Sequence, residues 1–126
     1  MLSDKDVCPT LAVKDMAAAS AFYEGVLGLE KGMESPGGVF YKCGGNTGVF
    51  VYPSASAGTN KATYAAWTVE DAAETAAALK AKGVSFLQYD DIPGVQRDGD
   101  IHTMGPSKSA WFTDPDGNIL NVVSGM

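Results

Sequence analysis

The length, composition and charge of the chain exclude several classes of protein. With 126 residues, 45% of them apolar and 19% charged, the chain has the composition of a folded protein, and we expect a single domain over residues 1–126. A net charge of -6 opposes binding to phosphate backbones, so we expect no nucleic-acid partner. The apolar stretches fall short of the roughly 20 residues that cross a bilayer, and residues 1–6 lack the basic start of a secretory signal. We therefore expect a cytoplasmic protein without a membrane partner.

The first half of the chain predicts one helix followed by three strands. Val7–Val13 is apolar enough for a first strand, and apolar residues then recur at helical spacing over Met16–Leu27. Asp15 is placed to cap this helix, and Gly28 to end it in a left-handed conformation. Gly-rich turns separate the three strands expected next, Leu29–Met33, Gly38–Cys43 and Gly48–Tyr52.

The second half repeats this order after a small, polar connector at residues 54–61, which we expect to be flexible. A strand at Tyr64–Val69 leads into an alanine-rich helix that follows Asp71 and ends at Gly83. The remaining expected segments are a strand at Val84–Leu87, a long loop from Asp90 to about His102, and strands at Ser109–Thr113 and Ile119–Val123. The pattern predicts two β-α-β-β-β modules, at about 7–53 and 62–124.

Three segments together resemble the vicinal oxygen chelate superfamily, which groups glyoxalases, bleomycin-resistance proteins and dioxygenases. They are Leu11–Asp15, the element Phe22-Tyr23-x-x-x-Leu27-Gly28-Leu29, and the strand–turn–strand segment Phe112–Leu120 with its Asp-Pro-Asp-Gly-Asn turn. The resemblance covers nearly the whole chain. It implies an α+β fold in which two β-α-β-β-β modules form a curved mixed sheet around a cleft, commonly in a homodimer.

The resemblance also implies where a metal ion would be held. In the family's enzymes, a His or Gln on the first strand of a module and a carboxylate on a last strand bind a divalent ion. The first-strand positions carry Cys8 and Tyr64 here, and the last-strand position carries Asn121. The last strand of module one, Gly48–Tyr52, has neither carboxylate nor imidazole. Because a thiol, a phenol and an amide do not suit a hard dication, we expect no metal and no other cofactor.

The same positions become candidates for binding a small molecule in an aromatic cleft. Cys8 has no base nearby in the sequence, so we expect an unreactive buried thiol. His102, the sole histidine, either orients a ligand from a loop at the cleft mouth or is a solvated loop residue. Strand alternation turns Trp67 toward the helix if Tyr64 faces the ligand. The candidate ligand-binding residues are Cys8, Phe50, Tyr64, His102, Trp111 and Asn121.

These features favour a metal-independent protein that binds a small metabolite or antibiotic as a homodimer. The alternative is an enzyme of the same family, a glyoxalase-like lyase or isomerase or a dioxygenase-like protein, with a non-standard or absent metal site. A third hypothesis is a partner-binding domain whose cavity is filled. The sequence does not identify the ligand, because function resides in the site and not in the fold.

Overall fold

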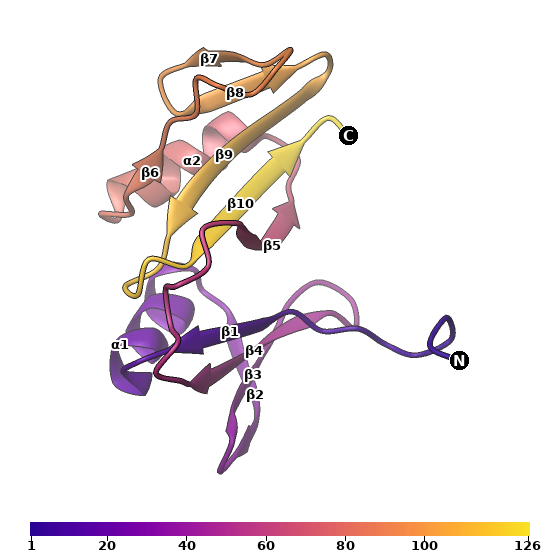
Figure 1. The fold of residues 1–126 in the computed structure, drawn as a ribbon, viewed down its shortest axis with the longest axis vertical. Helices are drawn as coiled ribbons and strands as arrows, with labels where there is room; N and C mark the ends of the chain where they lie inside the picture. The colour runs from indigo at the N-terminus through magenta and orange to yellow at the C-terminus, as the bar shows by residue number, and fades with distance from the viewer. The chain divides into compact units, whose positions relative to one another are not determined.

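The computed structural model describes residues 1–126 and consists of two compact units, Met1–Gly58 and Thr59–Met126 (Figure 1). Each unit contains one mixed sheet and its own helical segment. The predicted α+β fold class is therefore confirmed. Its helices are too short to span a membrane, the longest having 10 residues.

The first unit follows the predicted β-α-β-β-β order. Its sheet has the strand order β1-β4-β3-β2, in which β1 pairs with β4 in parallel and the other neighbours are antiparallel. The first predicted strand is shorter than expected, because pairing begins only at Thr10. The elements are β1 (Thr10–Val13), α1 (Met16–Ser20), η1 (Ala21–Val26), β2 (Glu30–Ser35), β3 (Gly38–Lys42) and β4 (Gly48–Pro53).

The helix of the first unit has the predicted ends but an unexpected second half. The Asp15 carboxylate accepts hydrogen bonds from the backbone N–H groups of Ala17 and Ala18, and Gly28 adopts a φ of 72° just after the helix. Between these ends, Ala21–Val26 forms a π-helix, with Leu27 N donating to Phe22 O. Helical periodicity predicts the apolar face but does not distinguish this wider turn from an α-helix.

The core of the first unit lies between this helix and one face of its sheet. The Tyr23 and Tyr41 rings stack at 6.0 Å between centroids, and the Tyr41 hydroxyl donates to Glu24 Oε2 at 2.9 Å. Tyr41 thus marks the face of the sheet that meets η1. The strand residues on that face are all buried: Leu11, Val13, Val39, Tyr41, Val49 and Val51.

The second unit has the same order with two extra strands. Its sheet runs β5-β10-β9-β8-β7, and β6 also pairs with β9. The counterpart of β2 is only two residues long here, half of the predicted Val84–Leu87. The elements are β5 (Thr63–Thr68), α2 (Ala72–Ala81), β6 (Phe86–Leu87), β7 (Gln96–Asp98), β8 (Ile101–Met104), β9 (Ser107–Thr113) and β10 (Ile119–Ser124).

The extra strands correct the predicted long loop from Asp90 to about His102. The chain forms an antiparallel hairpin, β7–β8, which joins the sheet through β8 and β9. Two-residue loops, Gly99-Asp100 and Gly105-Pro106, connect the strands, and both glycines have positive φ. Glycine at the first central position suits such tight turns, because no Cβ resists the left-handed conformation. His102 is consequently a strand residue and 2% exposed.

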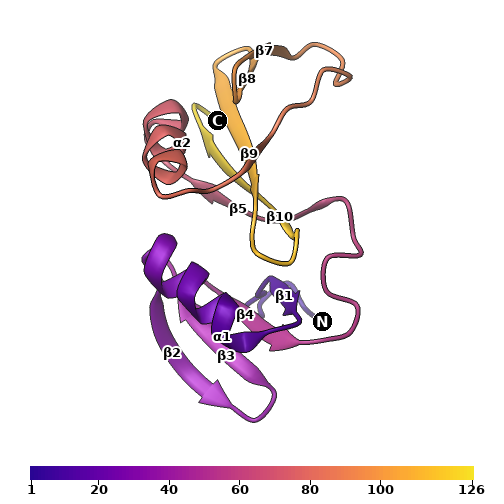
Figure 2. The ribbon, with the colours of Figure 1, turned by 90° about the vertical axis from the view of Figure 1, so that its left-hand side faces the viewer.

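Helix α2 covers one face of the second sheet (Figure 2). The Asp71 carboxylate caps it by accepting from Glu74 N, and Gly83, with a φ of 89°, follows it as predicted. The Ser124 hydroxyl accepts from Ala72 N at 3.0 Å, so the even-numbered residues of β10 face α2. Phe112 pairs with Leu120 on this face and is 1% exposed.

The connector is more ordered than its composition predicted. Ser54 N donates to Val13 O at 2.9 Å, and the Ser54 hydroxyl accepts from Ser56 N. Ala57 is 4% exposed. Small residues in this segment allow a compact turn that packs against the first unit, so residues 54–58 are not a free linker.

Candidate functional site

The face of the second sheet that points away from α2 carries three predicted site residues, His102, Trp111 and Asn121. His102 on β8 pairs with Ser109 on β9, and Trp111, two residues further along β9, pairs with Asn121 on β10. Residues that pair or alternate in this way share one face of a sheet. The His102 and Trp111 rings meet edge to face, with centroids 4.8 Å apart.

A cavity of about 260 Å³ lies beside this aromatic pair. The inserted hairpin, the loop that precedes it and strand β9 all contribute to its walls. None of the lining residues carries a formal charge when His102 is neutral. They are Ile92, Val95, His102, Met104, Ser107, Ser109 and Trp111.

The hydrogen bonds at its two ring nitrogens define the tautomer of His102. Its Nε2 lies 2.9 Å from the backbone N of Tyr89 and must accept from that N–H group. Its Nδ1 lies 3.1 Å from Asp100 O and must donate, because a carbonyl oxygen only accepts. The geometry therefore requires the neutral tautomer with the proton on Nδ1. Both ring nitrogens are engaged by the backbone, so the imidazole forms a wall of the cavity and fixes the loop.

Trp111 is held in place from two sides. Its indole Nε1 donates to the Thr63 hydroxyl at 3.1 Å, and the Tyr89 ring meets the indole edge to face at 5.2 Å. The indole remains half-buried and lines the cavity. Such an anchored aromatic offers a ligand apolar area at little entropic cost.

Arg97 and Asp100 hold the loop before β7 and the β7–β8 hairpin in place around the cavity. Arg97 donates to Asp90 through Nε at 2.7 Å and Nη2 at 3.1 Å, a two-pronged pairing across the loop. Asp100 accepts from Lys80 Nζ at 3.0 Å and from Gln88 Nε2 at 2.6 Å, which ties the hairpin to α2. The hydrogen bond from Arg97 lowers the pKa of Asp90, and that from Lys80 lowers the pKa of Asp100.

Tyr64 and Asn121 lie on neighbouring strands of this unit, but a bulge changes the predicted register. Ile119 pairs with Thr63 and Leu120 with Ala65, which leaves Tyr64 as the extra residue. Thr63 therefore lies beside Trp111, in the place that strict alternation along β5 would give to Tyr64. Asn121 is 6% exposed, and its Nδ2 donates to Ala110 O at 3.2 Å.

Cys8 and Phe50 belong to the first unit. Cys8 is exposed, and its Sγ lies 3.3 Å from Pro9 O and 3.4 Å from Gly48 O. The expectation of a buried thiol is wrong, because the strand starts only after this residue. Phe50 stacks with Tyr52 at 6.3 Å between centroids, on the sheet face away from η1.

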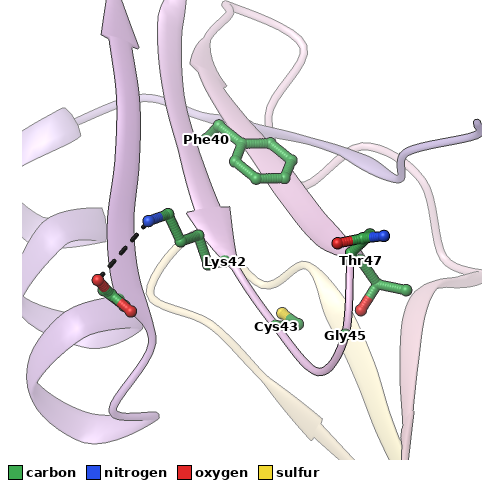
Figure 3. Close-up of a pocket in the computed structure, with 7 residues that line it drawn as sticks. Phe40, Lys42, Cys43, Gly45 and Thr47 are labelled. Atoms are coloured by element: carbon green, nitrogen blue, oxygen red, sulfur yellow. Dashed lines mark ion pairs between the residues drawn. The ribbon is translucent and has the colours of Figure 1, made fainter.

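A second hollow, of about 380 Å³, lies at the end of β3 in the first unit (Figure 3). The Phe40 ring lies across Gly48, where an added Cβ would approach the ring to 2.2 Å. Lys42 reaches toward Glu30, with 3.7 Å between Nζ and Oε1, and both side chains are more than half exposed. This hollow is lined by charged and polar groups, in contrast to the cavity of the second unit.

A carboxylate that accepts two side-chain hydrogen bonds lies on the π-helix of the first unit. Glu24 Oε2 accepts from the hydroxyls of Ser20 and Tyr41, and these bonds lower the pKa of Glu24. Burial, followed by the bond to Glu24, raises the pKa of Tyr41. The cluster lies on the helix side of the sheet and ties η1 to β3, so its role is structural.

Several cavity residues were not predicted from the sequence. Ser107 and Ser109 alternate with Trp111 along β9, so the choice of Trp111 already implied both serines. The Gly-first turns were the available signal for the hairpin that brings His102 and Met104 to the cavity. Nothing in the local pattern indicates Tyr89, which reaches His102 through tertiary contacts.

Comparison with known families decides the relationship of the chain. The model of the Glyoxalase/Bleomycin resistance protein/Dioxygenase superfamily matches residues 7–122. The chain belongs to this superfamily. No curated protein sequence matches it significantly.

Solved structures of the superfamily share the fold at low sequence identity. A genomically encoded fosfomycin resistance protein from Listeria monocytogenes is 18% identical, with coverage of 100% of this chain and 96% of that one and a TM-score of 0.72. Lactoylglutathione lyase from Agrobacterium tumefaciens is 21% identical, with coverage of 96% and 94% and a TM-score of 0.69. An antibiotic binding protein from Streptomyces sp. CB03234 is 18% identical, with coverage of 98% of both chains and a TM-score of 0.67.

The residues that the sequence predicts at the superfamily's metal positions have donor groups that do not suit a divalent ion. Asn121, at the carboxylate position, is an amide whose nitrogen already donates to Ala110 O. Cys8 and Tyr64 supply a thiol and a phenol at the first-strand positions. Within each unit, no three side chains of His, Cys, Asp or Glu are grouped so as to hold a metal ion. We therefore derive no chemistry through such an ion.

Proposed function

We propose that the protein binds a small organic molecule without a metal ion, as a metabolite- or antibiotic-binding member of the superfamily. The observation that carries the proposal is the donor set at the metal positions. An amide engaged with Ala110 O replaces the carboxylate that would neutralise a dication, and a thiol and a phenol replace the imidazoles. Without a Lewis acid, the metal-dependent reactions of the superfamily's enzymes would lack the group that stabilises their developing charge.

The same site retains the features of a ligand-binding surface. His102 and Trp111 border an uncharged cavity, and Asn121 lies one strand away with an amide oxygen suited to accepting a hydrogen bond. Tyr64, on the neighbouring strand β5, is included in the proposed ligand-binding set of the second unit, and Cys8 and Phe50 are proposed as ligand-binding residues of the first unit. An antibiotic binding protein has this fold, which supports the proposal without identifying the ligand.

The test combines metal analysis with a ligand screen. Purified protein is analysed for zinc, nickel, iron and manganese, and its thermal unfolding is then followed against a broad panel of metabolites and antibiotics in the presence of EDTA. We expect no stoichiometric metal and at least one compound that raises the melting temperature, since a ligand that binds only the folded state stabilises it. Stoichiometric, tightly held metal would overturn the proposal, and turnover of a bound compound would favour the enzymatic alternative.

We further propose that the protein is a cytoplasmic homodimer. The sheet faces turned away from the helices carry half-buried aromatic side chains such as Phe40, Phe50 and Trp111, which a second copy would help to cover. Light scattering during size-exclusion chromatography measures the molar mass. A value of twice the 13.1 kDa chain is expected, and a monomer at all concentrations would contradict the dimer.

A further inference from the structure

We propose that the cavity beside Trp111 selects an uncharged, single-ring compound that carries one hydroxyl or carbonyl group. This inference rests on the proposed binding function and names the class of ligand. It is carried by the charge, volume and hydrogen-bonding capacity of the cavity formed by the inserted hairpin and the loop before it.

The uncharged walls of the cavity disfavour a ligand that carries a charge. Apolar groups of Ile92, Val95 and Met104 line the cavity together with the Trp111 indole, and His102 is neutral because its Nε2 accepts a hydrogen bond from the Tyr89 N–H group. A carboxylate or ammonium group that enters such a site loses its hydration without gaining a counter-charge. A charged ligand therefore binds more weakly than a neutral compound of the same shape.

The charged residues that anchor the loop and the hairpin are paired with each other. Arg97 holds Asp90 through two hydrogen bonds, and Lys80 holds Asp100. A ligand charge would have to compete with these partners for Arg97 or Lys80, and neither of these two residues lines the cavity. The pairs instead fix the loop that carries Ile92 and Val95, so the walls are organised before a ligand binds.

The volume suits one ring with a short substituent. An apolar cavity of about 150 Å³ is large enough to hold benzene. The cavity measures about 260 Å³, which leaves room for one small group beyond the ring. A fused-ring drug would not fit wholly within it.

The hydrogen-bonding groups that remain for a ligand are two hydroxyls. Ser107 and Ser109 are half-buried along one wall, and each hydroxyl both donates and accepts. His102 and the Trp111 Nε1–H group are engaged within the chain. A hydroxyl or carbonyl on the ligand would therefore be recognised by the serine side of the cavity.

The experiment compares benzyl alcohol, benzoate and benzylammonium, which share a ring and differ in charge. Binding to the full chain is measured by tryptophan fluorescence and by ligand-observed NMR at about 0.3 M salt, where the Debye length is short and the net charge of -6 has little influence. We expect benzyl alcohol to bind at least tenfold more tightly than either ion. Equal or tighter binding of an ion, or no binding of benzyl alcohol, would overturn the inference.

Single-tryptophan variants locate the binding. The chain has two tryptophans, and Trp67 pairs with Val122 on the α2 side of the sheet. In Trp67→Phe, benzyl alcohol should change the remaining Trp111 fluorescence. In Trp111→Phe, the remaining Trp67 signal should not respond. A response confined to Trp67 would overturn the inference.

Serine variants test the polar wall. In the double variant Ser107→Ala/Ser109→Ala we expect about a fivefold loss of benzyl alcohol affinity, which corresponds to roughly one neutral hydrogen bond. Lys108→Ala, between them on the opposite face, is the matched control and should retain affinity. Unchanged affinity in the double variant would contradict the polar wall. If the broad panel yields a ligand but this series does not bind, the inference falls and the proposed function stands; failure of the whole panel overturns both.

Discussion

The two units share a plan but differ at one edge of the sheet, and this difference accounts for the uncharged cavity of the second unit. In the first unit, the six-residue strand β2 pairs along β3. In the second, β9 has two shorter partners, β6 near one end and β8 near the other. The insertion of a hairpin in place of a continuous edge strand gives the second unit a cavity wall that the first unit lacks.

The difference extends to the chemistry of the two hollows. The hollow of the first unit is lined in part by the exposed pair Glu30–Lys42, whereas the cavity of the second unit has uncharged walls. Exposed ion pairs contribute little to stability and are readily solvated. An uncharged, partly enclosed cavity is the better setting for an organic ligand, so the comparison favours the second unit as the binding element.

The largest expected loss of stability distinguishes the sheet face that a helix covers from the sheet face turned away from the helix. Phe112→Ala, in the core of the second unit, should cost about 3–5 kcal/mol of the free energy of unfolding, because it removes a buried ring and leaves a cavity. Phe50→Ala, a half-buried ring on the other face of the first sheet, should cost about 1 kcal/mol. Urea unfolding followed by circular dichroism measures both. Equal losses would show that the two faces are equally core-like.

A smaller effect concerns the anchor of the inserted hairpin. His102→Leu removes the acceptor for the Tyr89 N–H group and should cost about 1–3 kcal/mol, the penalty for an unsatisfied buried donor. Thr103→Val, the next residue on β8, is the matched control and should change little. Unchanged stability in His102→Leu, measured in the same urea experiment, would show that the loop finds another partner.

The corresponding anchor in the first unit is the hydroxyl of Tyr41. Tyr41→Phe keeps the ring packed against Tyr23 but removes the hydrogen bond to Glu24, and should cost about 1 kcal/mol. The same substitution should raise the pKa of Glu24 toward its ordinary value, because one of the bonds that lower it is gone. NMR titration of the Glu24 carboxyl measures this shift. A pKa that does not move would contradict the role given to the hydroxyl.

The smallest expected effect is a dependence of stability on acidic pH. The folded-state pKa of Glu24 lies below its ordinary value of 4.5, so its contribution is fully present above pH 4.5 and is lost as the pH falls through the lowered value. Glu24→Gln should therefore flatten this part of the acid unfolding profile. Asp100→Asn should do the same for the second unit. Urea midpoints between pH 7 and pH 3 that follow the unsubstituted protein would contradict both assignments.

The sequence predicts the architecture well because the signals for it are local. The caps at Asp15 and Asp71 and the terminating glycines Gly28 and Gly83 are each determined by a few neighbouring residues. The repeated module follows from their order. The polar composition of residues 90–102, by contrast, favours a loop. The Gly-first turns at Gly99, within the β7–β8 hairpin, and at Gly105, between β8 and β9, were the stronger signal.

The site was predicted less well because it depends on register and tertiary pairing. The bulge at Tyr64 shifts the strand by one residue, and alternation alone does not reveal a bulge. The pairing of His102 with Ser109 requires knowledge of the inserted strand. Cys8 was expected to be an unreactive buried thiol because no base lies near it in the sequence, but strand pairing begins only at Thr10 and the residue is exposed.

The π-helix at Ala21–Val26 has a consequence for how the chain tolerates changes in length. A π-turn holds one residue more than an α-turn over nearly the same rise. Removing a single residue there would relax the segment into a regular α-helix of almost unchanged reach, with Asp15 and Gly28 still at its ends. Shorter variants of this segment should thus still fold, but Glu24 would rotate away from Tyr41 and the tie between helix and sheet would be lost.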